Sequence, residues 1–200
     1  MTAAPALIAR PDTALADAAD AMLQAAAPPA LVAHCHRTYV FAAALLDRRG
    51  LDYDREALFL GATLHDLGLT PAWTHTTTPF EEHGAQVAHE ALLQQGARPE
   101  LADLVADAIR LHLLLTTADD PRPEVAGIHL GAGADVIGLR IDKIPPTTVD
   151  LALETFPRQS LASFLREALG DEARRKPDCT MAQLVAEVNF LDLLANGPGE

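Results

Sequence analysis

The chain has 200 residues, which is enough for one generous domain with a substantial buried core and does not require two domains. Its formal net charge is -13 with histidine neutral, so long-range electrostatics disfavour nucleic acid and anionic membranes as partners. The chain has only two cysteines, and no segment approaches the roughly 18 apolar residues of a membrane span, which predicts a soluble, cytoplasmic protein.

The composition favours helices over strands. The chain is rich in alanine and leucine, only 4% of its residues are aromatic, and it lacks alternating β-branched runs. Apolar residues recur at helical spacing nearly throughout, with proline and glycine between the periodic segments. We therefore predict an all-α fold, with helices at about residues 12–27, 30–49, 54–68, 78–95, 99–115, 123–139, 147–155, 159–175 and 180–195.

Two of these segments carry start signals for a helix. The run Thr78-Pro79-Phe80-Glu81 combines a capping-box threonine and glutamate with proline at the first helical position. Thr180 and Gln183 have the spacing of a second cap. The last two segments, residues 159–175 and 180–195, are expected to form a C-terminal pair of helices.

His65 and Asp66 are adjacent polar residues inside the apolar pattern of the third expected helix. Burying an unpaired carboxylate costs on the order of several kcal/mol or more, so a buried doublet of this kind needs a partner. A metal ion is the first candidate for that partner.

Helical phase separates the eight histidines into two groups. His34, His65, His83 and His112 fall on the apolar stripes of four different helices. Asp135 lies on a stripe of glycines and small residues on a fifth. The other histidines are assigned to the surface or to loops: His36, His75, His89 and His129.

A structural interpretation of these inward residues remains open. A lone inward histidine is more often a hydrogen-bonded core residue than a ligand, and His83 and His112 taken singly fit that description. The whole set is harder to explain in this way, because few cations are available to neutralise Asp66 and Asp135 together. Arg37 and Lys143 could each pair with one carboxylate, which would give a purely structural ion-pair network.

The order His34, then His65-Asp66, then Asp135 resembles the ligand pattern of the HD-domain superfamily over roughly residues 30–145. Three further segments look like stretches of its cyanamide hydratase-like branch: residues 80–85, 108–112 and 133–138. The resemblance implies an HD-domain helical bundle with a C-terminal helical extension. We expect a single domain over residues 1–200, with a metal-binding core at about 30–145 and C-terminal helices at about 147–195.

The resemblance also implies a metal site and an activity. His34, His65, Asp66 and Asp135 would bind one divalent metal, either zinc or iron, with manganese as a further option. The implied activity is that of a hydrolase or hydratase (a hydro-lyase), which attacks a small-molecule substrate with a metal-activated water. Asp66, His83 and His112 are the candidate catalytic residues, for proton transfer and for orienting the substrate.

His83 and His112 keep two other reactions open. Branches of the superfamily that bind two metals use two additional histidines in the interval where these residues fall. A second metal held by His83 and His112 would make the protein a di-iron oxygenase. An HD phosphohydrolase acting on a nucleotide or phosphomonoester would instead need a basic pocket, for which the nearby cations are Arg37, Arg110, Arg140 and Lys143.

A non-catalytic role is the remaining alternative. The metal or an ion-pair network would then only hold the bundle together, and the C-terminal helices would mediate assembly. A homodimer is one such assembly. The apolar residues of these helices recur at the spacing of a buried face, which is more often core than interface: Leu161, Phe164, Leu165, Leu184, Val188 and Leu191.

Overall fold

The computed structural model describes residues 7–199, and within this range every regular element is helical. The predicted all-α fold is confirmed. The α-helices are α1 (Ala14–Ala26), α2 (Pro29–Arg49), α3 (Arg55–Leu64), α4 (Phe80–Gln94), α5 (Pro99–Leu111), α6 (Pro123–Ile137), α7 (Pro146–Thr155), α8 (Leu161–Arg175), α9 (Thr180–Val188) and α10 (Phe190–Leu193). Four short 3-10 turns accompany them: η1 (Leu67–Leu69), η2 (Leu115–Asp119), η3 (Ile141–Lys143) and η4 (Leu194–Asn196).

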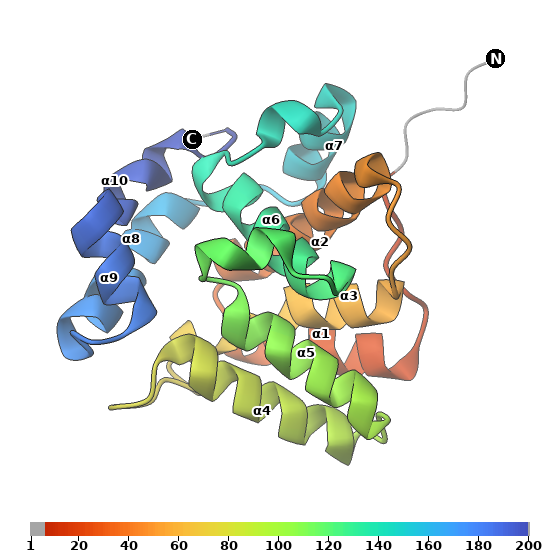
Figure 1. Ribbon diagram of the computed structural model, residues 1–200, viewed down its shortest axis with the longest axis horizontal. Coiled ribbons are helices and arrows are strands. Elements are labelled where there is room, and N and C mark those ends of the chain that lie inside the picture. The colour runs from red at the N-terminus through yellow and green to blue at the C-terminus, as the bar shows by residue number, and fades with distance from the viewer. Residues whose placement is uncertain (1–6, 200) are drawn as a thin grey trace.

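Helix α2 is the central element of the bundle and packs against α3 and α6 (Figure 1). The crossing of α2 and α6 is close because residue 131 is a glycine. A Cβ atom added at Gly131 would lie 2.3 Å from the carbonyl oxygen of Thr38. Since His34 and Asp135 each lie one helical turn from this crossing, the same approach brings their side chains together.

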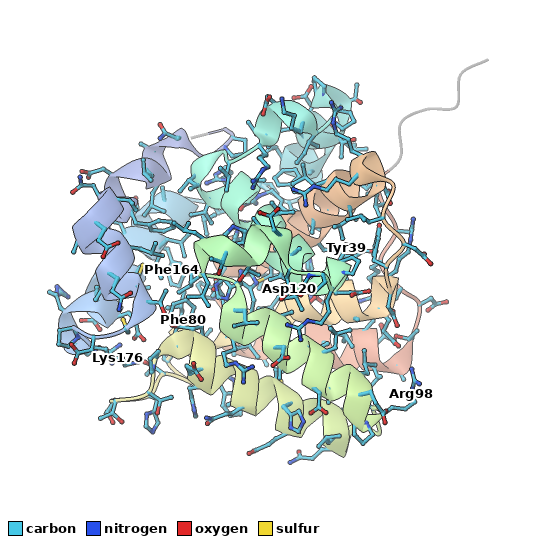
Figure 2. All side chains as sticks on the ribbon, in the orientation of Figure 1. Tyr39, Phe80, Arg98, Asp120, Phe164 and Lys176 are labelled. Carbon is cyan, nitrogen blue, oxygen red and sulfur yellow. The ribbon has the colours of Figure 1, made fainter. Side chains whose placement is uncertain are left out.

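The C-terminal helices α8, α9 and α10 lie side by side along one edge of the bundle, drawn in blue in Figure 1. Leu165 and Met181 belong to the same buried cluster as Leu64 and Phe80 from the main bundle. Figure 2 shows Phe80 and Phe164 where the two parts meet. The two parts therefore share a core, while the assignment of the chain to a single domain stays a prediction.

The predicted cap at Thr78 is wrong, because a distant residue takes over its function. Helix α4 begins after Pro79 without a side-chain cap from its own N-cap residue. Instead, the free backbone amide of Phe80 donates to Glu172 Oε1 on α8 at 2.8 Å. Glu81, the other half of the predicted capping box, is buried at 3% exposure. Tertiary packing thus replaces the local cap.

The last predicted helix, residues 180–195, is two helices in the structure. Asn189 has a left-handed backbone with φ 51°, and this residue separates α9 from α10. The predicted cap at Thr180 is also wrong, since the N-cap residue is Cys179, whose Sγ accepts from the amide of Ala182. No helix within residues 7–199 combines the length and apolar character needed to cross a bilayer.

Candidate metal centre

His65 and His112 each lie directly after a helix, at the ends of α3 and α5. Each ring donates its Nδ1–H to the carbonyl oxygen three residues earlier, Ala62 at 2.8 Å and Ile109 at 2.6 Å. These hydrogen bonds satisfy carbonyls that the helix ends leave open. They also fix the neutral tautomer in which Nε2 carries a lone pair rather than a proton.

The prediction that the His65-Asp66 doublet lies inside a helix is therefore wrong. Helix α3 ends at Leu64, and Asp66 has φ -106° and ψ 12° outside it. The chain turns here because α4 starts close by. A Cβ atom at Gly68 would lie 2.2 Å from the carbonyl oxygen of Phe80, so only glycine allows the approach. The turn moves the Asp66 carboxylate to the same side as the His65 ring.

His34, His65 and Asp66 form a buried cluster that could hold a metal ion. His34 Nε2 lies 3.2 Å from His65 Nε2, and Asp66 Oδ2 lies 3.4 Å from each of these nitrogens. The three atoms form a nearly equilateral triangle. Its edges match the roughly 3.3 Å edge of a tetrahedron whose corners lie about 2.0 Å from a central ion, which is the usual distance to zinc.

The electrostatics of the triangle also fit a cation. Burial alone would lower the pKa of His34, but its contacts with Asp135 and Asp66 outweigh burial and raise it, so the site favours positive charge at this ring. Because the Nδ1–H of His34 donates to Asp135 Oδ2 at 2.7 Å, the neutral ring would present an Nε2 lone pair to the lone pair of His65. Two facing lone pairs repel unless a proton or a cation lies between them. Burial alone would raise the pKa of Asp66, but the nearby histidines His65 and His34 outweigh burial and hold this pKa well below its usual range. Asp66 is therefore a carboxylate.

Asp135, predicted as the fourth ligand, contributes no atom to this triangle. Its two oxygens accept from His34 Nδ1, from Arg37 Nε at 2.6 Å and Nη2 at 2.9 Å, and from Arg158 Nη1 at 3.1 Å. Asp135 is thus placed to orient the His34 ring, as carboxylates often do behind a histidine ligand. Burial would raise the pKa of Asp135, and its hydrogen bonds to His34 and Arg37 lower it instead.

The ion-pair interpretation accounts for Asp135 but not for Asp66. Arg37 is fully buried and pairs with Asp135 through two of its nitrogens. Across residues 7–199, no lysine or arginine forms an ion pair with Asp66, and the titratable side chains within 3.8 Å of its carboxylate are all histidines. Lys143, the second predicted partner, pairs with Asp142 at 2.6 Å. Asp66 therefore depends on the imidazoles and on whatever cation they hold.

His112 lies at the edge of the cluster. Its Nε2 is 3.8 Å from Asp66 Oδ1, the oxygen that faces away from the triangle, and its ring centroid is 5.0 Å from that of His65. Burial lowers the pKa of His112 to about 4, so the ring is neutral near pH 7. The sequence placed His112 inward, and the structure brings it to Asp66.

His129 was assigned to the surface, and this assignment is wrong. The side chain is buried, with 7% of the residue exposed, and its Nδ1–H donates to the backbone carbonyl of His112 at 2.8 Å. The signal that could have found it is a helical stripe, because His129, Ala132, Gly133 and Val136 recur at spacings of three and four along α6 and line one cavity.

The structure does not bring His83 to the cluster. Its ring is half-buried and lies 4.9 Å from the ring of His75. The buried face of α4 passes through Gly84 and Ala88, which leaves His83 at the edge of that face. Gly84 packs on the backbone of Gly68, where an added Cβ would be 3.4 Å from the amide nitrogen, so the close packing of this helix sets its rotation.

Residues 31–149 match the HD domain family. The chain belongs to the HD-domain family. No curated protein matches the chain. An HD domain with a histidine and aspartate cluster that could hold a divalent metal points to a metal-dependent, hydrolase-type function.

The HD domain and the C-terminal helices together enclose a cavity of about 250 Å³ above the cluster. Five polar residues lie at the end formed by the HD domain: His34, His65, Asp66, His112 and His129. We call these five residues the polar floor. The remaining lining is apolar, and about half of it comes from helices after residue 149, outside the part of the chain that matches the family.

Proposed function

We propose that this HD-domain protein is a metal-dependent hydrolase or hydratase that acts on a small molecule, in the manner of cyanamide hydratases. The triangle of His34 Nε2, His65 Nε2 and Asp66 Oδ2 at the floor of a cavity carries the proposal. These residues would hold zinc or iron, with manganese as an alternative, because imidazole and carboxylate suit all three metals. A bound ion polarises the substrate and lowers the pKa of water toward neutrality.

Asp66 and His112 are the proposed proton-transfer groups. Asp66 Oδ2 faces the two imidazole nitrogens, while Oδ1 faces His112 Nε2. Burial lowers the pKa of His112 to about 4, so the ring is neutral near pH 7 and its Nε2 lone pair would accept a proton from a water already acidified by a bound ion. Asp66 Oδ1 lies beside that nitrogen and would orient the water between them.

The proposed reaction on a nitrile-like group is an addition of water. The water oxygen forms a bond to the nitrile carbon, one π-electron pair moves to the nitrogen, and one water proton passes to His112. His112 then delivers this proton to the nitrogen, and tautomerisation gives the amide. The net reaction consumes one water and needs neither an oxidant nor a reductant.

Two rival reactions have less support from the site. A di-iron oxygenase would need the second histidine pair, and His83 lies with His75 instead of with the cluster. A phosphohydrolase would need cations around the phosphate. Arg37 is engaged with Asp135, Arg110 pairs with Asp107, and within residues 7–199 no lysine or arginine lines the cavity.

Metal content and metal-dependent turnover test the proposal. The protein is purified without added metal, its metal per chain is measured, and chelated protein is reloaded with Zn²⁺, Fe²⁺ or Mn²⁺. We expect about one ion per chain and metal-dependent hydration of cyanamide or of a small aliphatic nitrile, lost in Asp66→Ala and retained in His36→Ala. About two irons per chain with consumption of dioxygen, or turnover of phosphomonoesters alone, would contradict the proposal.

A further inference from the structure

We infer that the substrate is an uncharged molecule with an aliphatic body and a single polar end group, which is bound with the polar end on Asp66 and the body among α8, α9 and α10. The inference rests on the proposed function, because it names the substrate class of the same site. It is carried by the apolar lining of the cavity, by the cavity entrance and by the lack of a cationic side chain in the described lining.

The lining of the cavity consists of the polar floor and an apolar remainder. Apart from the polar floor, all of its lining is aliphatic, aromatic or glycine: Phe80, Leu113, Leu115, Ala132, Gly133, Val136, Ile137, Leu139, Leu165, Leu169, Met181, Leu184, Val188, Phe190 and Leu193. In the described part of the chain, no hydroxyl, amide or cationic side chain lines this region. A polar group placed there would lose its water without gaining a hydrogen bond, which costs about 1–3 kcal/mol by protein data.

The entrance to the cavity is apolar as well. Leu115 in η2 is 68% exposed and Val188 at the end of α9 is 40% exposed, and both line the cavity. Exposed leucine and valine at the mouth of a pocket favour the capture of an apolar body over that of an ion. The entrance and the interior therefore select for the same chemistry.

Burial, reinforced by the charge of Arg140, lowers the pKa of His129, but Arg140 does not line the cavity. Three other basic residues around the cavity are already engaged. Arg37 and Arg158 both donate to Asp135, on the side of His34 away from the triangle. Lys176, on the C-terminal side, bonds both oxygens of Glu172 at 2.7 and 2.8 Å. An anionic substrate would thus find no protein cation in the cavity, and its charge would be balanced by the metal alone.

The C-terminal helices decide the substrate class in this arrangement. Residues Leu165, Leu169, Met181, Leu184, Val188, Phe190 and Leu193 all lie beyond residue 149, where the family match ends. We call these seven residues the apolar roof. The cavity of about 250 Å³ is smaller than the roughly 300–1,000 Å³ of sites for drug-sized ligands, so the aliphatic body is short.

Straight-chain hydroxamates on the zinc-loaded protein test this inference. The head group binds the metal in every member, so acetohydroxamate, butanohydroxamate and hexanohydroxamate differ only in the aliphatic tail. We expect affinity by calorimetry to rise about three- to fourfold for each added methylene until the cavity is full. 4-Aminobutanohydroxamate, with the butano tail carrying a charge, should bind more weakly than butanohydroxamate. Equal affinities along the series, or tighter binding of the amino compound, would overturn the inference.

Roof variants locate the effect in the protein. Leu184→Asn and Val188→Asn change partly exposed positions, so the fold should tolerate them. Both should reduce the gain per methylene and leave the affinity for acetohydroxamate unchanged. Leu93→Asn on α4, at a residue 39% exposed and outside the cavity lining, is the matched control and should behave like the native chain. A gain per methylene that the two roof variants leave intact would overturn the assignment.

A second probe series separates this inference from the proposed function. The n-alkanols from ethanol to hexanol lack a metal-binding head group, and their thermal shifts should rise with chain length even if hydroxamates fail to bind. A flat alkanol response would overturn the apolar substrate class. A rising response in a protein that neither hydrates nitriles nor hydrolyses other uncharged substrates would overturn the reaction and support the substrate class.

Discussion

The polar floor and the apolar roof hold their shape in different ways. In the floor, the two histidine ligands are positioned by other polar groups: His34 by Asp135, which in turn bonds Arg37, and His65 by the carbonyl of Ala62. In the roof, side chains pack without directional bonds, and the helix pair α9 and α10 is broken at Asn189. A hydrogen-bonded floor fixes where a reaction takes place, while a packed roof can change its shape and select a substrate without disturbing that chemistry.

The largest effect should come from removing one floor ligand. His34→Ala deletes a corner of the triangle and the hydrogen bond to Asp135, so metal affinity should fall by more than the roughly 10- to 100-fold typical of losing an outer-shell partner. Titration with a competing chelator measures the affinity. His36→Ala is the control, because His36 sits two residues away and bonds Asp20 at 2.7 Å. Equal metal affinities in the two variants would show that His34 is not a metal ligand.

Asp135→Asn tests the support behind the floor. The change keeps the shape of the side chain but leaves the buried Arg37 guanidinium without its negative partner, which should cost about 3–5 kcal/mol in the free energy of unfolding. Metal affinity should also fall about 10- to 100-fold, because the His34 ring loses its orienting carboxylate. Urea unfolding and chelator titration measure the two effects.

The control for Asp135→Asn is Asp142→Asn, which removes an exposed carboxylate from its pair with Lys143. Solvent screens an exposed pair of this kind, so it contributes little to stability. If the Asp135 variant bound metal as tightly as the control, Asp135 would be a purely structural partner of Arg37.

The pH dependence of stability tests the contact between the HD domain and the C-terminal helices at Glu81. This residue lies in the first turn of α4, near Glu172 and Thr180, and its Oε2 has no hydrogen-bond partner in the described structure. Burial, reinforced by the charge of Glu172, raises the pKa of Glu81 from 4.5 to about 7. The folded chain therefore binds the proton more tightly than the unfolded chain does.

The stabilisation of the folded chain by this proton is fully present below pH 4.5, and it is lost as pH rises through about 7. The shift corresponds to a loss on the order of 3 kcal/mol of unfolding free energy across that interval. Glu81→Gln should remove this loss, so the difference between variant and native stability should grow with pH. Urea unfolding at several pH values measures it, with Glu82→Gln as the control. A difference that is constant from pH 4.5 to 8 would contradict the assignment.

The smallest effect should come from shortening one side chain of the apolar roof. Leu165 is 2% exposed and borders the cavity, so Leu165→Ala enlarges a space that already exists. The loss in unfolding free energy should be about 2 kcal/mol, at the low end for such truncations. Metal content should not change. Loss of metal together with stability would show that the floor depends on the packing of the roof.

The sequence was sufficient for the fold class and for the expectation that His34, His65 and Asp66 lie together. Helical periodicity indicated the bundle, and the isolated polar pair His65-Asp66 with the inward His34 indicated the cluster. A helical pattern of apolar residues, which repeats every 3.6 residues, can continue past the end of a helix, so it could not show that α3 and α5 end just before His65 and His112.

The other differences between prediction and structure come from contacts between distant residues, and the assignment of Asp135 as a metal ligand stays a prediction. Whether Asp135 faces an ion or the other nitrogen of His34 depends on Arg37 and on Arg158, which approaches from the chain beyond α7. The start of α4 depends on Glu172, 92 residues away. The wrong assignment of His129 to the surface has another cause. It does not depend on a distant contact, since the stripe of His129 on α6 can be found in the sequence.

Gly131 has a consequence for genetics. A methyl group there would collide with the backbone of Thr38 and push α6 away from α2, although it would touch neither His34 nor Asp135. The distance between those two side chains would grow, and the His34 ring would lose its anchor. A screen for inactive variants that keep their helical content should therefore recover substitutions at position 131 as well as at the ligands. Such a substitution would inactivate the protein in the same way as the loss of a ligand, although it lies one helical turn away.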